Sequence, residues 1–124
     1  MNSKVKFGGT VEEQNELASL VLMGEKTATS SLFELKTERE LSCIGDIWEI
    51  NNGLDQQLCR VQVISVEVVK FGDVTEEFAK AEGDGTFQNW LDIHTRYYSF
   101  LLEKYNKKLT KDTLLECVYF EKIY

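Results

Sequence analysis

The sequence predicts a single α+β domain, in which helices flank a mixed or antiparallel sheet that closes as a small barrel. Two observations lead to this fold class. Helical periodicity appears in three separate segments, and the strand-like segments around them lack the regular strand–helix alternation of a parallel α/β fold. The longest strand-like segment also shifts its apolar phase along its length, as a bent strand does.

The first helix is predicted over residues 11–23. A T-x-x-E capping box opens it, because the Thr10 hydroxyl accepts from the Glu13 amide while the Glu13 carboxylate reaches back to Thr10. Apolar residues then recur at helical spacing: Leu17, Leu20 and Val21. Gly24 stands where a helix commonly ends in the left-handed conformation.

Two short strands are predicted next. Residues 27–33 alternate in polarity and form the first, and the charged residues 36–41 form a surface loop. Residues 47–50 form the second strand. The Asn-Gly pair in Asn51-Asn52-Gly53 then predicts a hairpin turn.

The longest predicted strand covers residues 58–69. Its apolar residues occupy odd positions up to Val63 and even positions from Ile64 onward. A slip of one residue turns the buried face over, so the sequence predicts a bulge or bend at this point.

The last third of the chain predicts two helices and a final strand. Asp73 is the expected cap of a short helix over residues 74–81, and Thr86 of a longer one over residues 87–102. The longer helix has an apolar face at i, i+3, i+4 and i+7 spacing: Phe87, Trp90, Leu91, His94, Tyr98, Leu101 and Leu102. Residues 114–120 then alternate as a strand.

The balance of acidic and basic residues limits the kinds of ligand and partner that the protein can bind. Fourteen basic and 21 acidic residues give a formal net charge of −7, which opposes binding to a polyanion such as duplex DNA. A small ligand, one nucleoside or a short single strand of RNA is easier to accommodate. No apolar run approaches the ~18–20 residues that span a bilayer, and the N-terminus lacks a signal peptide's apolar core. We therefore expect no membrane partner and a cytoplasmic location.

The three cysteines, Cys43, Cys59 and Cys117, are widely spaced and include no C-x-x-C pair. They indicate neither a disulfide framework nor a zinc site, and isolated buried thiols are the simplest interpretation.

The first candidate site is the segment from Gly24 to Ser31, which places a lysine, two threonines and two serines directly behind the first helix. Such a cluster is typical of a site that binds an anion or activates a nucleophile, and equally of a polar turn between a helix and a strand. Lys26 and Thr29 converge only if the chain turns tightly between them. A lysine activates a threonine only when burial or a nearby cation lowers its pKa towards neutrality.

Two further candidates lie downstream. Glu82 precedes a Gly-x-Gly turn that could carry its carboxylate into a cleft, although an exposed capping glutamate is the more common outcome. Glu82 and Asp84 do not amount to a metal site, because the chain has one histidine and no matching ligand cluster. That histidine, His94, lies one helical turn after Trp90 and is either a core residue or the wall of a pocket for a base.

Several motifs occur in a fixed order. Phe7-Gly8 comes first, and the first helix then leads into the run Leu20-Val21-Leu22-x-Gly24-x-Lys26-Thr27-Ala28-Thr29-Ser30-Ser31-Leu32. The others are Gly45-Asp46, Val69-x-Phe71-Gly72-Asp73-Val74, Ala81-Glu82-Gly83-Asp84-Gly85, Trp90-x-x-x-His94 and Val118-x-Phe120. Together they resemble the ASCH-domain family, named for homology to a transcriptional cointegrator, and most of all its longer bacterial subgroup.

The resemblance implies a PUA-like mixed β-barrel flanked by helices, with a cleft that was proposed to bind RNA. It also implies chemistry. Small bacterial members hydrolyse the acetyl amide of N4-acetylcytidine with a lysine, a threonine and a glutamate that correspond to Lys26, Thr29 and Glu82. Another member is described as a ribonuclease. The small amidohydrolases carry an arginine where this chain has Ser31, which weakens the transfer of substrate specificity.

The resulting hypothesis is an amidohydrolase that needs no metal or cofactor. Lys26 takes a proton from Thr29 or from water, and backbone amides near residues 26–30 stabilise the oxyanion. Glu82 orients the lysine or protonates the departing amine, and the second role needs a pKa raised by burial. Substrate contacts are expected from Thr27, Ser30, Ser31, Trp90 and His94. The alternative function is an RNA-binding module, with or without ribonuclease activity.

Overall fold

A computed structural model describes residues 2–123 and contains one five-stranded sheet and three α-helices. The elements in chain order are β1 (Asn2–Val5), α1 (Val11–Leu22), β2 (Ala28–Leu32), β3 (Ile47–Asn51), β4 (Gln57–Lys70), α2 (Glu76–Ala81), α3 (Phe87–Glu103) and β5 (Leu114–Ile123). Short 3-10 turns lie at Phe33–Leu35, Glu38–Glu40 and Phe71–Asp73. None of the helices in this part of the chain combines the length and the apolar character needed to cross a membrane.

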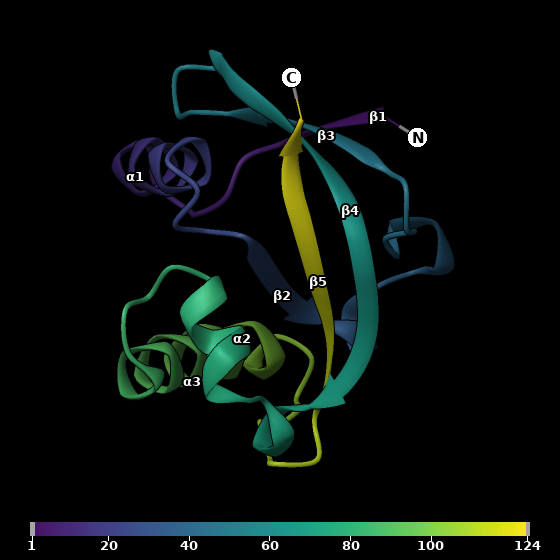
Figure 1. Cartoon of the computed structure of the whole chain (residues 1–124). Coiled ribbons are helices and arrows are strands. Elements are labelled where there is room, and N and C mark those ends of the chain that lie inside the picture. Colours follow the sequence, from purple (N-terminus) through teal and green to yellow (C-terminus); the bar gives the residue numbers. More distant parts are fainter. Residues whose placement is uncertain (1, 124) are drawn as a thin grey trace.

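The sheet is mixed, with strand order β1-β3-β4-β5-β2. The edge strand β1 runs parallel to β3, whereas the other neighbouring pairs are antiparallel. The long strands β4 and β5 curve together through the length of the molecule, and all three helices lie on one side of them (Figure 1). The register of β4 against β5 shifts between Val63 and Ser65, which confirms the predicted bulge.

The curvature turns the sheet into a half-barrel. Its two edge strands are far apart in the strand order, yet Ser3 of β1 and Ser31 of β2 line one and the same cavity. The predicted α+β class with a PUA-like barrel flanked by helices is therefore confirmed, with the barrel curled but open along one side.

Two separate apolar clusters hold the helices on the sheet. Helices α2 and α3 cover the first, which includes Phe78, Trp90, Tyr98, Leu102 and Leu115. Helix α1 covers the second, which includes Ala18, Val21, Trp48, Ile50, Val61 and Phe120. Burying one large apolar side chain contributes about 1.5–3 kcal/mol, so each cluster anchors its own helices. The two clusters leave α1 and α3 on either side of a cavity lined by both helices.

The predicted helix caps are confirmed with one exception. The Thr10–Glu13 capping box and the Thr86 cap are both present. Asp73, however, does not cap α2, because the Phe71 and Gly72 amides donate to the carbonyls of Thr113 and Lys111 and hold this segment as a separate turn. The cap is Thr75, and α2 starts at Glu76, two residues later than predicted.

Three further expectations need correction. Strand β1 was not predicted, since an edge strand that carries Val5 as its one apolar residue gives no alternation signal. The β3–β4 hairpin is present, but its loop extends to Gln56, and the residue with positive φ is Asp55 and not Gly53. Cys117 is buried as expected, whereas Cys43 is exposed in the loop before β3.

Candidate active site

Lys26 lies in the short connection between α1 and β2, and its side chain is only 5 % exposed. Backbone hydrogen bonds fix this connection on both sides: the Lys26 amide donates to the Leu20 carbonyl, and the Thr27 amide donates to the Ala81 carbonyl. The Lys26 Nζ donates to the Ala28 carbonyl at 2.9 Å and to the Glu82 carbonyl at 3.1 Å. The amine is therefore held by the backbone of two segments that are 54 positions apart.

Glu82 is the C-cap of α2 and is 3 % exposed. Gly83 follows it with φ +94°, a conformation that side chains rarely adopt, and a Cβ there would lie 3.3 Å from the Lys26 Cβ. This glycine lets the chain turn directly against the lysine. As a result, the Glu82 Oε1 lies 3.8 Å from the Lys26 Nζ.

The Glu82 carboxylate collects hydrogen-bond donors from two elements. Its Oε1 accepts from the Ser30 amide at 3.1 Å, and its Oε2 accepts from the Ser30 hydroxyl at 2.7 Å and from the Trp90 indole. The Tyr98 hydroxyl lies 2.6 Å from the Ser30 Oγ, and because Ser30 donates to the carboxylate, Tyr98 is the donor in this pair. A chain of hydrogen bonds thus runs from Tyr98 through Ser30 to Glu82.

His94 completes the group from α3. Its ring stacks on Trp90 with centroids 4.5 Å apart, and its Nδ1 lies 2.8 Å from the Trp90 carbonyl oxygen. Its Nε2 lies 3.5 Å from the Glu82 Oε2, and its Nδ1 lies 3.8 Å from the Asp84 Oδ2. Two carboxylates and two nitrogen bases therefore meet at one place.

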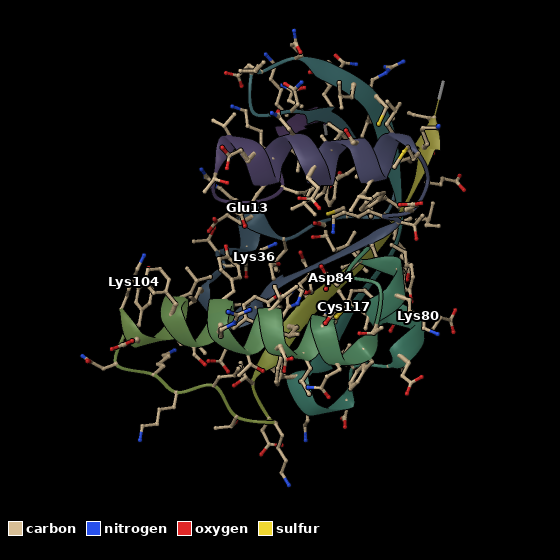
Figure 2. All side chains as sticks on the ribbon, turned by 90° about the vertical axis from the view of Figure 1, so that its left-hand side faces the viewer. Glu13, Lys36, Lys80, Asp84, Lys104 and Cys117 are labelled. Carbon is tan, nitrogen blue, oxygen red and sulfur yellow. The ribbon has the colours of Figure 1, made fainter. Side chains whose placement is uncertain are left out.

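These groups open into a cavity of about 360 Å³. Helix α1 and the Gly8-Gly9 segment line one side, and α3 lines the other with Ile93, His94, Tyr97 and Tyr98. Figure 2 looks onto this face and shows Glu13 and Asp84 between α1 above and α3 below. The volume lies within the ~300–1,000 Å³ that small-ligand pockets occupy.

Burial lowers the pKa of Lys26 from its ordinary value of 10.5, and this desolvation outweighs the opposing charges of Glu82 and Asp84. Desolvation acts on Glu82 in the opposite sense, towards a higher pKa. The His94 hydrogen bond and the Lys26 charge prevail there, so the pKa of Glu82 lies below 4.5. The carboxylate is held ionised although it is buried.

Two further groups have raised pKa values. Burial would lower the pKa of His94, but the hydrogen bond and charge of Glu82 raise it above 6.5. Burial raises the pKa of Asp84 above 3.8 against the charge of His94. Among residues 2–123, no set of three histidine, cysteine or acidic side chains is arranged to hold a metal ion.

The structure brings together most of the residues that the sequence singled out. Lys26, Thr29, Ser30, Glu82 and His94 all line the cavity. No hydrogen bond joins Lys26 to Thr29 in the described part of the chain; the two share only the cavity wall.

Three other candidates lie away from this cavity. Thr27 uses its amide and its carbonyl in backbone bonds to Ala81 and Phe120. Ser31 lines a second, neighbouring cavity, and Trp90 is fully buried behind His94.

Sequence reasoning missed two residues of the site. The spacing of apolar residues places Tyr98 on the apolar face of α3, although its position one turn after His94 is a usable signal for a site residue. Phe7 places the centroid of its ring 4.8 Å from the Lys26 Nζ; its place in the Phe7-Gly8 motif is the signal in the sequence, but that motif does not predict a contact with the lysine.

The second cavity, of about 650 Å³, shares Phe7, Thr29 and Ser30 with the first. It contains another buried carboxylate, Glu116, which accepts from the Lys36 Nζ at 2.7 Å and from the Ser42 amide at 3.0 Å.

Comparisons with known proteins agree with this fold. A sequence profile of the ASCH domain matches residues 3–124. Among solved structures, an ASCH domain from Lactobacillus crispatus JV V101 is 25 % identical with a TM-score of 0.92, and the alignment covers 99 % of this chain and 80 % of that one. Protein EF3133 from Enterococcus faecalis V583 is 33 % identical with a TM-score of 0.87 and the same coverage. The hypothetical protein PH0355 is 18 % identical with a TM-score of 0.65, and the alignment covers 99 % of this chain and 100 % of that one. At this identity the likeness shows the fold alone. No curated protein matches the sequence significantly.

Proposed function

The chain belongs to the ASCH-domain family, and from this membership and the geometry of its cavity we propose that it is an amidohydrolase acting on an acylated nucleoside of the N4-acetylcytidine type. The observation that carries the proposal is that the buried Lys26 lines the cavity and that its amine lies beside an ionised, buried carboxylate.

The surroundings of the Lys26 amine support a role as general base. A tetrahedral amine nitrogen has four positions; Cε occupies one, and hydrogen bonds to the Ala28 and Glu82 carbonyls occupy two. The fourth holds a proton in the charged form and a lone pair in the neutral form. Because desolvation lowers the pKa of Lys26, the neutral form with its lone pair is accessible at a lower pH than for an exposed lysine.

The nucleophile is the Thr29 hydroxyl or a water molecule in the cavity. Thr29 lines the cavity together with Lys26, which supports either assignment. The amides of Lys26, Thr27 and Ser30 already donate to protein acceptors, so the expected oxyanion site near residues 26–30 does not include these three.

Glu82 acts as the orienting group in this proposal. Its lowered pKa removes the alternative in which a protonated Glu82 delivers a proton to the departing amine. Its backbone carbonyl holds the Lys26 amine, and its carboxylate lies 3.8 Å from the same nitrogen. The negative charge stabilises the protonated lysine that forms when the nucleophile gives up its proton.

RNA binding is the competing function, and the charge pattern of the second cavity argues against it. Lys36 and Arg39 are cations on this wall, but Lys36 is paired with Glu116. Three further acidic side chains line the cavity: Glu38, Glu40 and Asp46. A chain of phosphates would meet more negative than positive charge there.

The test is hydrolysis of N4-acetylcytidine, followed as cytidine release by chromatography. We expect turnover by the native chain and a loss of about 10²-fold or more in Lys26→Ala, because the general base is removed. Glu82→Gln should also lose turnover. Lys108→Ala is the matched control, since Lys108 is exposed and does not line the cavity. A folded native protein without turnover would refute the proposed substrate.

A further inference from the structure

We propose that His94 is the general acid of this hydrolysis and passes the proton on its Nε2 to the departing amine nitrogen. The inference rests on the proposed function. It gives His94 a catalytic role in place of the substrate contact expected from the sequence.

The hydrogen bond at Nδ1 fixes the tautomer of His94. A backbone carbonyl oxygen only accepts hydrogen bonds, so the Nδ1 that lies 2.8 Å from the Trp90 carbonyl carries a proton. The stacking of the ring on Trp90 holds the imidazole plane in place. The remaining nitrogen, Nε2, is therefore the atom whose protonation changes.

The surroundings of Nε2 favour its protonated form. It lies 3.5 Å from the Glu82 Oε2, and a neutral imidazole would turn a lone pair towards this carboxylate. The groups that face His94 are Glu82 and Asp84 from the loop before α3 and Tyr98 from its own helix, with Lys26 beyond Glu82. Because two carboxylates and only one lysine surround the His94 ring, the local charge favours its protonated, positively charged form.

The Nε2 proton is also available for transfer. The hydrogen bond from Nε2 to the Glu82 Oε2 is long, because its 3.5 Å exceeds the ~2.7–3.2 Å of a well-formed N–H···O bond, so Glu82 favours this proton without holding it tightly. His94 lines the cavity, and its side chain is 12 % exposed. A substrate nitrogen in the cavity can therefore compete for the proton.

The other acids on this wall are less suited. Glu82 is ionised, and its oxygens accept from Ser30 and Trp90. Burial raises the pKa of Tyr98 well above 10, and its hydroxyl proton is directed at Ser30. Asp84 is the remaining candidate for the proton donor. Its Oδ2 lies 3.8 Å from the His94 Nδ1, on the side of the ring away from Nε2.

The step balances as a hydrolysis. When water is the nucleophile, its oxygen bonds to the amide carbon while one of its protons passes to Lys26. The carbon–nitrogen bond then breaks, its electron pair stays on nitrogen, and this nitrogen takes the Nε2 proton of His94. The Lys26 proton returns to His94 through solvent, so the net reaction consumes one water and releases an acid and an amine.

The test uses the pH dependence of N4-acetylcytidine hydrolysis. In the native chain the rate should rise as Lys26 loses its proton, below the ordinary lysine value of 10.5, and fall as His94 loses its proton, above the ordinary 6.5. His94→Asn keeps a donor near the Nδ1 position and removes Nε2. We expect it to lose about 10²–10⁴-fold in rate together with the falling limb. His94→Gly should regain rate with added imidazole in proportion to the imidazolium fraction.

Several results would overturn the inference. A falling limb that persists in His94→Asn, or that disappears instead in Asp84→Asn, would remove His94 as the proton donor while the proposed function stands. A native protein without turnover would refute both proposals together. Thermal unfolding followed by circular dichroism checks that each variant is folded. If His94→Asn does not fold, His94→Gln takes its place, because it also lacks the acidic imidazole.

Discussion

Glu82 shows how a single buried residue can be kept charged. Burial alone would favour its neutral form, but donors from β2 and α3 surround both oxygens. Ser30 supplies two of these donors, its amide and its hydroxyl, and Tyr98 orients the hydroxyl. The ionised Glu82 in turn keeps His94 protonated, so the state of the site depends on groups that need not touch a substrate.

The hydrogen-bond chain from Tyr98 to Glu82 predicts a non-additive effect on stability. Ser30→Ala should destabilise the protein by about 1–3 kcal/mol, because it leaves both the Tyr98 hydroxyl and the Glu82 Oε2 short of a partner. Tyr98→Phe should cost about 1 kcal/mol. The double variant should lose less stability than the sum of the two single losses, by about 0.5 kcal/mol or more. The reason is that the phenylalanine at position 98 has no hydroxyl that Ser30→Ala could leave without a partner. Urea unfolding measures all three, and strict additivity would show that the chain is not coupled.

At the scale of single residues, part of the site could be predicted. Lys26 and Glu82 were identified through their motifs, and both are buried on the cavity wall. The sequence could not show that Ser30 would bridge Tyr98 and Glu82, because this contact joins three segments that meet only in the folded chain. The sequence also left two roles open for Glu82, and only the role of proton donor needs a raised pKa. The lowered pKa could not be predicted, because the number of donors around the carboxylate depends on tertiary packing.

At the scale of elements, the segment between β2 and β3 is attached to the sheet at two places. Its end is bonded to β4, because the Gly45 amide donates to the Val63 carbonyl and the Val63 amide donates to the Asp46 carbonyl. Glu116 of β5 accepts from Lys36 and from both the amide and the hydroxyl of Ser42. Residues 36–46 form much of the wall of the larger cavity. The part of this wall around Lys36 and Ser42 therefore depends on one buried carboxylate.

Glu116→Gln tests this attachment. The substitution removes the charge that pairs with Lys36, and we expect a loss of about 1–3 kcal/mol in the free energy of unfolding. The Ser42 amide should also lose hydrogen-exchange protection, because its acceptor is weakened. Glu121→Gln is the matched control: Glu121 lies on the same strand, is exposed, and should change stability by less than about 0.5 kcal/mol. Unchanged protection at Ser42 would mean that other contacts hold the segment.

Elements with strong local signals were predictable, and those that depend on a partner were not. The capping box placed α1, and the phase slip placed the bulge of β4. Strand β1 exists because its backbone pairs with β3, not because of its own side-chain pattern. The start of α2 moved to Glu76 because the preceding turn bonds to the segment before β5, which no local pattern reveals.

At the scale of the whole molecule, the negative net charge and the two neighbouring cavities together constrain which ligand can bind. The net charge of −7 gives the protein a field that repels anions. The smaller cavity has a volume of about 360 Å³, and the larger one shares Phe7, Thr29 and Ser30 with it. A neutral nucleoside enters this field without an electrostatic penalty, whereas its negatively charged, phosphorylated form is repelled.

This difference predicts how hydrolysis responds to salt. For neutral N4-acetylcytidine, kcat/KM should change little between about 0.02 M and about 0.5 M salt, because no net charge is brought to the protein. For its 5′-monophosphate, kcat/KM should start lower and rise over the same range, as screening relieves the repulsion that a charge of −7 exerts. The neutral substrate serves as the control for effects of salt on the enzyme itself. A kcat/KM for the monophosphate that instead falls with salt would show that a local positive field, such as that of Lys36 and Arg39, outweighs the net charge and favours a phosphate-bearing substrate.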